Sequence, residues 1–192
     1  MRKVFASLFI SIDGAVQAPN EWQHAFDDEM GAALSRIMES QDAVLLGRGT
    51  FTEWAGYWPT STDEPFASWI NSTPKYVASS TLQSVHAWQN STLIPGSVAD
   101  FVNDLKQQDG GNIGTAGSPT LVRSLLEAGV LDELTLFVHP VVAGGGYAKL
   151  FPHGSAPVQF EVADTETTST GTIIVTYRPK AVARPVREAV GK

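Results

Sequence analysis

Residues 42–51 have the sequence DAVLLGRGTF, and this stretch decides the fold. Its continuous apolar run from Ala43 to Leu46 is typical of a strand that is buried on both faces of a sheet. Gly47 ends the run, and Thr50 stands where the next helix opens. Before the run, apolar residues recur every three or four positions from Asp27 to Ser40, which predicts an amphipathic helix. The sequence therefore predicts strands that alternate with helices.

Apolar side chains alternate along the first predicted strand. One face carries Val4, Ala6, Leu8, Ile10 and Ile12, and the other carries Phe5, Ser7, Phe9 and Ser11. The basic start followed by an apolar stretch resembles a signal peptide. Asp13 ends the stretch early, however, and the alternation favours a strand.

The remaining pattern completes an α/β fold. Further strands are expected at 76–80, 92–94, 112–113 and 134–142, with helices at 97–110 and 118–129. Residues 159–165 and 172–178 alternate around Thr- and Ser-rich turns, as an antiparallel hairpin does. We expect three layers: a mixed, mostly parallel central sheet, helices on both faces and a C-terminal hairpin. Residues 1–179 would form one domain, and residues 180–192 a tail that is either frayed or an arm onto a partner subunit.

Composition narrows the class of protein. The 192 residues carry a net charge of −7, so nucleic acid and acidic membranes are not expected partners. No run is long and apolar enough to span a bilayer. The absence of cysteine excludes disulfides, thiolate nucleophiles and Cys-based metal sites, and it fits a cytoplasmic protein. His24, His86, His139 and His153 are far apart, so we expect no metal site and a structural role for each.

Three strand ends carry groups that suit phosphate or ribose. Residues 114–119 link a short strand to a helix N-terminus, where backbone N–H groups and the helix dipole favour an anion. Residues 47–50 follow the buried strand and offer a cation, Arg48, and a hydroxyl, Thr50. Ser79 and Ser80 end another apolar run. Each segment alone could be an ordinary turn, but together they would form one site if the strands are neighbours.

The motifs taken in order resemble the standalone relatives of the riboflavin-biosynthesis reductase domain, within the dihydrofolate reductase superfamily. The resemblance runs from about Lys3 to Tyr177. It rests on SIDG at 11–14, DAVLLGRGTF at 42–51, GTAGSPTLV at 114–122, LDEL at 131–134, PVV at 140–142, GGG at 144–146 and LF at 150–151. In the bifunctional riboflavin enzymes this domain is joined to a zinc deaminase. That activity is excluded here, because its cysteine ligands are missing.

The resemblance implies that the cofactor is NADPH. Gly47, Arg48 and Thr50 would lie near the adenosine phosphates, and Ser79 and Ser80 near the 2′-phosphate. The pyrophosphate would be surrounded by Gly114, Thr115, Ala116, Gly117, Ser118, Thr120 and Leu121. A homodimer is the habit of the family.

The substrate side is less defined by the sequence. Asp13 is the candidate catalytic acid, although an Asp-Gly turn explains it equally well. Asp27, Asp28 or Glu29 lies in the region where folate reductases hold the pterin, without a clean match, and stabilisation of the helix start is the favoured explanation for this acidic cluster. Trp22 and Trp54 would either wall a cleft for a flat heterocycle or simply pack. The implied substrate is 5-amino-6-(5-phosphoribosylamino)uracil, with dihydrofolate or a pterin second and a non-catalytic NADPH-binding protein third. The proton could come from Asp13, from the acidic helix start or from water.

Overall fold

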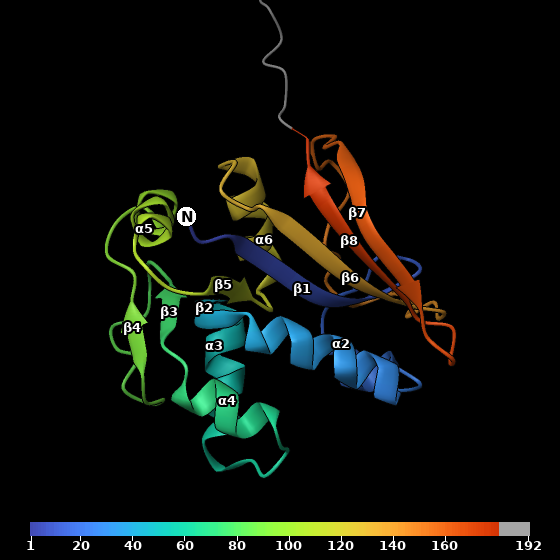
Figure 1. The fold of residues 1–192 in the computed structure, drawn as a ribbon, viewed down its shortest axis with the longest axis horizontal. Coiled ribbons are helices and arrows are strands. Elements are labelled where there is room, and N and C mark those ends of the chain that lie inside the picture. The colour runs from blue at the N-terminus through green and yellow to red at the C-terminus, as the bar shows by residue number, and fades with distance from the viewer. Residues whose placement is uncertain (181–192) are drawn as a thin grey trace, which may run out of the picture.

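The computed structural model describes residues 1–180, and an eight-stranded sheet runs through its middle (Figure 1). Strands β1 to β6 are parallel to one another, whereas β8 is antiparallel to β6, and β7 is antiparallel to β8. The order across the sheet is β4-β3-β2-β5-β1-β6-β8-β7. In chain order the strands are β1 (Val4–Ser11), β2 (Gln41–Gly47), β3 (Lys75–Ala78), β4 (Ser91–Leu93), β5 (Asn112–Thr115), β6 (Glu133–His139), β7 (Phe160–Thr167) and β8 (Ile173–Pro179).

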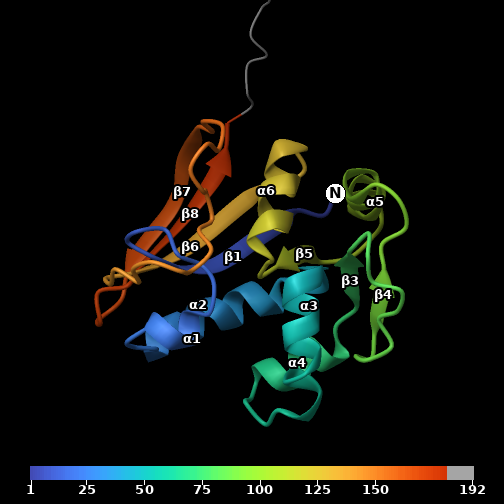
Figure 2. The same ribbon diagram turned by 180° about the vertical axis from the view of Figure 1, so that it is seen from behind.

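Helices cover both faces of this sheet, which gives the three layers that the sequence predicts. The helices are α1 (Pro19–Trp22), α2 (Asp28–Glu39), α3 (Arg48–Ala55), α4 (Phe66–Ser72), α5 (Val98–Gln107) and α6 (Pro119–Glu127), with a short 3-10 helix, η1 (Trp58–Thr60). Helices α2, α3 and α4 lie on one face, and α5 and α6 lie on the other (Figures 1 and 2). The predicted α/β fold with its mixed sheet is therefore confirmed.

The alternation along β1 divides the core as expected. Val4, Ala6, Leu8 and Ile10 are buried in a cluster that includes Val102 of α5 and residues of α6 such as Val122. Phe9, on the opposite face, packs with Phe137, Met30 and Ala33 beneath α2. A third cluster joins Val44 and Leu46 of β2 to Phe51 of α3 and Ile70 of α4. Apolar burial on both faces fixes the position of the central strands.

Three predicted strands end earlier than the sequence suggests. Residues 134–142 were expected to form one strand, but β6 ends at His139, because Pro140 has no N–H group to donate to a neighbouring strand. Ile12 lies beyond β1 and is 64% exposed, so it does not share the buried face of that strand. The serines at 79 and 80 follow β3 instead of belonging to it.

Helix starts follow the predicted capping pattern. The carboxylate of Asp27 accepts a hydrogen bond from the Met30 N–H at the start of α2. Ser97 and Ser118 cap α5 and α6 in the same way. Of the predicted C-terminal tail, residues 181–192 lie outside the described residues.

Candidate functional site

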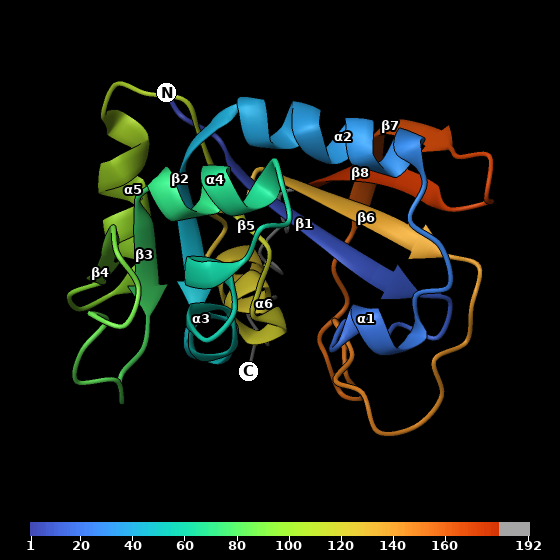
Figure 3. The ribbon, with the colours of Figure 1, turned by 90° about the horizontal axis from the view of Figure 1, so that it is seen from below.

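The three segments that the sequence singles out follow neighbouring strands. Strand β2 lies between β3 and β5, with Gly47 in register with Ala78, and Val44 in register with Gly114. Because all three strands are parallel, their carboxyl ends meet at one edge of the sheet. Residues 47–50, 79–80 and 114–121 therefore lie along the same edge (Figure 3).

Two of these segments touch directly. The Gly47 N–H donates a 3.1 Å hydrogen bond to the carbonyl oxygen of Gly117. A Cβ atom on Gly47 would lie only 2.3 Å from the hydroxyl oxygen of Ser118 and 2.9 Å from its backbone nitrogen. Gly117 has φ +134°, and a Cβ there would be 3.0 Å from the Thr50 hydroxyl. The sequence needs glycine at both positions, because only glycine lets the two backbones approach this closely.

The segment at 114–121 leads into the N-terminus of α6. The Ser118 hydroxyl accepts a 3.4 Å hydrogen bond from the Leu121 N–H, and Pro119 is the first helical residue. The Thr115 hydroxyl fixes the turn by donating to the Gly117 carbonyl and accepting from the Gly117 N–H, at 3.1 and 3.2 Å. Backbone N–H groups and the positive end of the helix dipole make this turn suitable for an anion.

The predicted cofactor residues of this segment differ in what they can offer. The Leu121 side chain is buried in the core, so only its backbone faces the turn. The open side of Gly114 is covered by Gln41, since a Cβ there would lie 2.0 Å from the Gln41 Oε1. Thr120 is exposed, and its hydroxyl accepts a 3.1 Å hydrogen bond from Arg123. Ala116 is half-buried. These residues can therefore contribute mainly backbone to a phosphate site.

Arg48 is the cation that this edge presents to solvent. It is exposed at the first turn of α3, and within residues 1–180 its guanidinium makes no hydrogen bond or ion pair. Ser80 is exposed as well, whereas the Ser79 hydroxyl accepts hydrogen bonds from the N–H groups of Thr81 and Leu82. An uncommitted guanidinium beside a helix N-terminus is the arrangement that holds a phosphate group.

Asp13 joins the two loops at the carboxyl ends of β1 and β6. Its carboxylate accepts hydrogen bonds of 2.7 Å from the Ser11 hydroxyl and 2.9 Å from the Ala143 N–H, and Lys149 Nζ lies 3.8 Å away. The Ser11 hydrogen bond, followed by that from Ala143, holds the pKa of Asp13 below its usual range. The side chain is therefore ionised near neutral pH and positions the loop that begins at Pro140.

Asp27 is held in a similar way at the start of α2. Besides capping the helix, its carboxylate accepts a 2.6 Å hydrogen bond from the hydroxyl of Thr170, in the turn between β7 and β8. This hydrogen bond is the main cause that lowers the pKa of Asp27 to about 2. Asp27 thus links the helix to the hairpin.

The two tryptophans predicted on the substrate side are not brought together. Trp22 of α1 is buried, and its indole N–H donates a 2.8 Å hydrogen bond to the Gln17 carbonyl. Trp54 of α3 packs edge-on against Trp58 and Phe66, with ring centroids 6.0 and 5.7 Å apart. The aromatic group around Trp54 therefore packs with itself above β2 and β3.

His139 is a polar group on the substrate side that sequence reasoning assigned to structure. It ends β6 in register with Ser11, and its ring is completely buried, between the edges of Phe9 and Trp22 at 5.5 and 5.7 Å. Neither ring nitrogen has a hydrogen-bond partner among the described residues. Burial lowers the pKa of His139, so the imidazole is neutral at pH 7. In the sequence, the position of His139 near the end of a predicted strand and directly before Pro140 was the feature that could have indicated a functional role.

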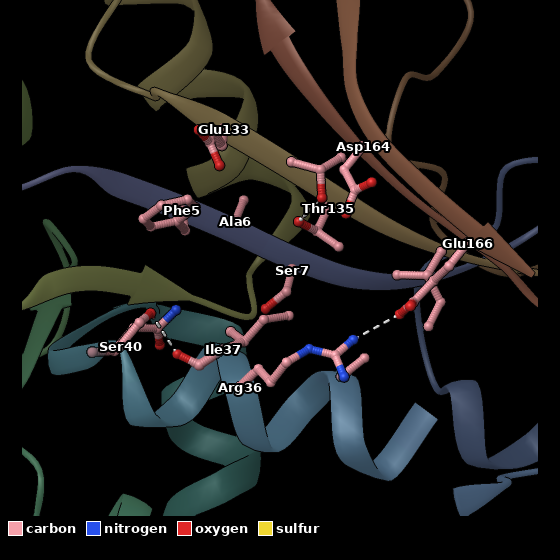
Figure 4. Close-up of a pocket in the computed structure, with 14 residues that line it drawn as sticks. Phe5, Ala6, Ser7, Arg36, Ile37, Ser40, Glu133, Thr135, Asp164 and Glu166 are labelled. Atoms are coloured by element: carbon pink, nitrogen blue, oxygen red, sulfur yellow. Dashed lines mark hydrogen bonds and ion pairs between the residues drawn. The ribbon is translucent and has the colours of Figure 1, made fainter. Parts of the chain in front are cut away.

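A separate pocket of about 200 Å³ lies at the opposite end of the same strands (Figure 4). Its lining includes Ser7 of β1 and Thr135 of β6, and an ion pair between Arg36 and Glu166 at 2.9 Å crosses it. None of the predicted site residues lines it. Between residues 1 and 180, no three His, Asp or Glu side chains are grouped to hold a metal ion. None of the helices described is long and apolar enough to cross a membrane.

The comparisons with known proteins agree with this geometry. The uncharacterized protein YyaP of Bacillus subtilis (strain 168) is 27% identical over 183 residues, which are 92% of this chain and 94% of YyaP. A putative riboflavin biosynthesis protein from Shewanella sp. PV-4 superimposes with a TM-score of 0.75 at 22% identity, over 93% of this chain and 99% of that one. The dihydrofolate reductase of Enterococcus faecalis, complexed with NADP(H), superimposes with a TM-score of 0.61 at 16% identity, over 93% and 97% of the two chains. The family model described as the RibD C-terminal domain matches residues 2–174. The chain therefore belongs to the RibD C-terminal domain family and has the dihydrofolate-reductase-like fold.

Proposed function

We propose that this protein is an NADPH-dependent reductase that transfers a hydride to a C=N or C=O group of a small heterocycle. The membership of the RibD C-terminal domain family indicates an oxidoreductase. Nicotinamide supplies the hydride when it is bound, and the protein contributes binding, orientation and electrostatics. No nucleophilic side chain or metal ion is needed for such a reaction.

The observation that carries this proposal is the contact between Gly47 and Gly117 at the carboxyl edge of the sheet. It places exposed Arg48 and the N-terminus of α6 beside one another, where two phosphate groups of a dinucleotide can be held together. Ser80 follows the next strand and would contact the 2′-phosphate. The E. faecalis neighbour with NADP(H) supports the same choice of cofactor.

The reduction also needs a source for one proton. Asp13 stays a predicted catalytic residue, but its hydrogen bonds from Ser11 and Ala143 favour the ionised form. Asp27 is ionised for the same reason. We therefore propose that both carboxylates position the loops and the helix around the substrate, and that water delivers the proton.

The substrate candidates follow from the family. The first is 5-amino-6-(5-phosphoribosylamino)uracil, and the second is dihydrofolate or another pterin. The third candidate is a protein that binds NADPH without catalysis, which the hydrogen bonds already made by both carboxylates would also allow. We also propose a homodimer in the cytoplasm, with NADPH and a small molecule as its ligands.

Two measurements test this function. Micromolar NADPH should raise the melting temperature, because a ligand that binds only the folded state stabilises it. Oxidation of NADPH, followed by absorbance with a panel of uracils, pterins and related heterocycles, then separates an enzyme from a binder. If micromolar NADPH does not bind, the protein is neither an NADPH-dependent enzyme nor an NADPH-binding protein. Light scattering at several concentrations tests the dimer.

A further inference from the structure

The end of the site that would face the nicotinamide is strongly acidic. Cofactor phosphates at the ends of β2, β3 and β5 leave the ends of β1 and β6 for the hydride acceptor, and these carry segments 12–31 and 140–150. The two segments contain five carboxylates, Asp13, Glu21, Asp27, Asp28 and Glu29, and one lysine, Lys149. Their net charge is therefore −4.

Hydrogen bonds hold these two segments together around the strand ends. The Val16 N–H donates to the Ala148 carbonyl at 3.0 Å, and the Ala148 N–H donates to the Gln17 side chain at 2.9 Å. The Tyr147 hydroxyl donates to Glu21 at 3.0 Å. Figure 3 shows α1 beside the ends of β1 and β6. Asp13 and Glu21 thus lie on this joined pair of segments, and Asp27 and Glu29 are hydrogen-bonded to the β7–β8 turn, which lies beside the end of β6.

The cations near this region are already occupied. Lys149 lies 3.8 Å from the carboxylate of Asp13. The guanidinium of Arg123, on α6, donates to the carbonyls of Lys149 and Leu150 at 3.4 and 2.8 Å and to Thr120 at 3.1 Å. Arg48 lies with the cofactor segments. A substrate phosphate would therefore meet an excess of negative charge, and the guanidinium of Arg123, although still charged, is held by its hydrogen bonds to these neutral oxygens.

The interior of the same region is neutral and aromatic. His139 is completely buried against Phe9 and Trp22, and both of its ring nitrogens lack partners among the described residues. Two titratable groups, His24 and Asp27, act electrostatically on it. A buried polar group without a partner is costly, and such groups occur where a ligand completes the hydrogen bonds.

We infer that the substrate is an uncharged nitrogen heterocycle without a phosphate group, and that His139 forms a hydrogen bond with it. The ring of Trp22 packs against the imidazole, so the inferred hydrogen bond requires Trp22 to move when the substrate binds. This inference rests on the proposed NADPH-dependent reductase. It ranks phosphate-free compounds above the phosphoribosyl compound that the family suggests.

Calorimetry on the protein saturated with NADP⁺ tests the substrate class with two matched pairs. One pair is an aminouracil riboside and its 5′-phosphate, and the other is a hydroxymethyl dihydropterin and its phosphate ester. We expect at least one phosphate-free compound to bind about tenfold or more tightly than its phosphorylated partner, with a smaller difference at high salt. Preference for the phosphate, or binding of neither ring, overturns the inference. If NADPH itself does not bind, the proposed function fails instead.

Asp28 provides a matched variant, because it is exposed and its side chain makes no hydrogen bond or ion pair with residues 1–180. Asp28→Asn should tighten binding of the phosphorylated compound several-fold and leave its phosphate-free partner unchanged. Asp104→Asn makes the same charge change on α5, at the other face of the sheet, and should alter neither. Equal effects of the two variants would contradict an acidic rim at the substrate.

His139 is tested separately. His139→Leu should weaken binding of the preferred compound about tenfold or more while the NADPH-induced rise in melting temperature is retained, and His139→Gln should recover part of the binding. His153→Leu removes an exposed histidine as a control. If both His139 variants bind the compound like the wild type and change only the melting temperature, the residue is structural and its assignment to the substrate is wrong.

Discussion

The hydroxyl of Thr170 donates a 2.6 Å hydrogen bond to the carboxylate of Asp27, across 143 residues of sequence. This contact ties the β7–β8 turn to the start of α2. Glu29 strengthens the same junction, because its carboxylate accepts from the N–H and the hydroxyl of Ser169, at 3.0 and 2.6 Å. The hairpin therefore helps to place the helix that borders the proposed substrate region.

Acid should weaken this junction. Since the pKa of Asp27 is lowered from 3.8 to about 2, the ionised carboxylate stabilises the fold above pH 4, and this contribution is lost as the pH falls toward 2. Asp27→Asn keeps a helix-capping side chain without the charge. Melting temperatures between pH 2 and 6 should therefore fall less steeply for the variant than for the wild type. Parallel curves would show that Asp27 has no such coupling.

The contact between the glycine segments predicts opposite effects for two neighbouring substitutions. Gly47→Ala places a Cβ against Ser118 and should cost about 1–3 kcal/mol of unfolding free energy and weaken NADPH binding. Gly49→Ala has no atom within 4 Å of its new Cβ and lies in α3, so it should stabilise by about 0.5–1 kcal/mol. Urea denaturation measures both. A harmless Gly47→Ala would mean that the two segments are not closely packed.

Arg48 should contribute to cofactor affinity but not to stability. Arg48→Ala removes an exposed guanidinium, and we expect NADPH to bind about tenfold or more weakly, equivalent to about 1.5–3 kcal/mol for a charged hydrogen bond. The control is Arg36→Ala, which removes the same charge from the last turn of α2, where Arg36 forms an ion pair with Glu166. Fluorescence titration with NADPH separates the two. Equal affinities would remove Arg48 from the phosphate site.

Lys75 gives the fold a pH dependence in the alkaline range. Its ammonium group is fully buried, donates to the carbonyls of Ile70 and Thr73 at 2.8 and 2.9 Å, and lies 4.6 Å from the centre of the Trp88 ring. Burial lowers the pKa of Lys75 from 10.5 to about 8, so the folded state binds fewer protons than the unfolded state between these values. This residue therefore makes stability rise with pH from 8 to 10.5.

Lys75→Met tests that coupling. The variant leaves two buried carbonyls without their donor and should lose about 1–3 kcal/mol at pH 7. The loss should grow as the pH is raised toward 10, because wild-type stability rises with pH over this range and Lys75→Met removes that rise. Chemical denaturation at pH 7, 8.5 and 10 measures the difference. A loss that stays constant or shrinks as the pH rises would contradict the lowered pKa.

Local pattern was enough to predict most of the architecture. The three-to-four-residue period of the apolar residues predicts α2, because this helix buries one face. The continuous apolar run at 43–46 predicts β2, because this strand is buried on both faces. The position of β5 between β2 and β1 could not be read in this way. It depends on which faces pack together, as in the contact of Ile113 with the α5 and α6 core.

The site was harder to predict where distant segments meet. Gly47, Arg48 and Gly117 could be predicted, because each lies at or just after the end of a strand and such strand ends are visible in the local sequence. The partner of Asp13 is the N–H of Ala143, 130 residues away, and no local pattern announces it. His139 was assigned a structural role because the sequence does not reveal that its ring is buried without a partner.

The hydrogen bond between Gly47 and Gly117 has a consequence for the order in which ligands load. This hydrogen bond preorganises the backbone of the proposed phosphate site, so the proposed dinucleotide would dock with little loss of conformational entropy. If the substrate bonds His139 as inferred, it must first displace the indole of Trp22, which would make its association the slower, conformationally gated step. Steady-state kinetics should therefore show an ordered sequence, with the nucleotide entering first and leaving last.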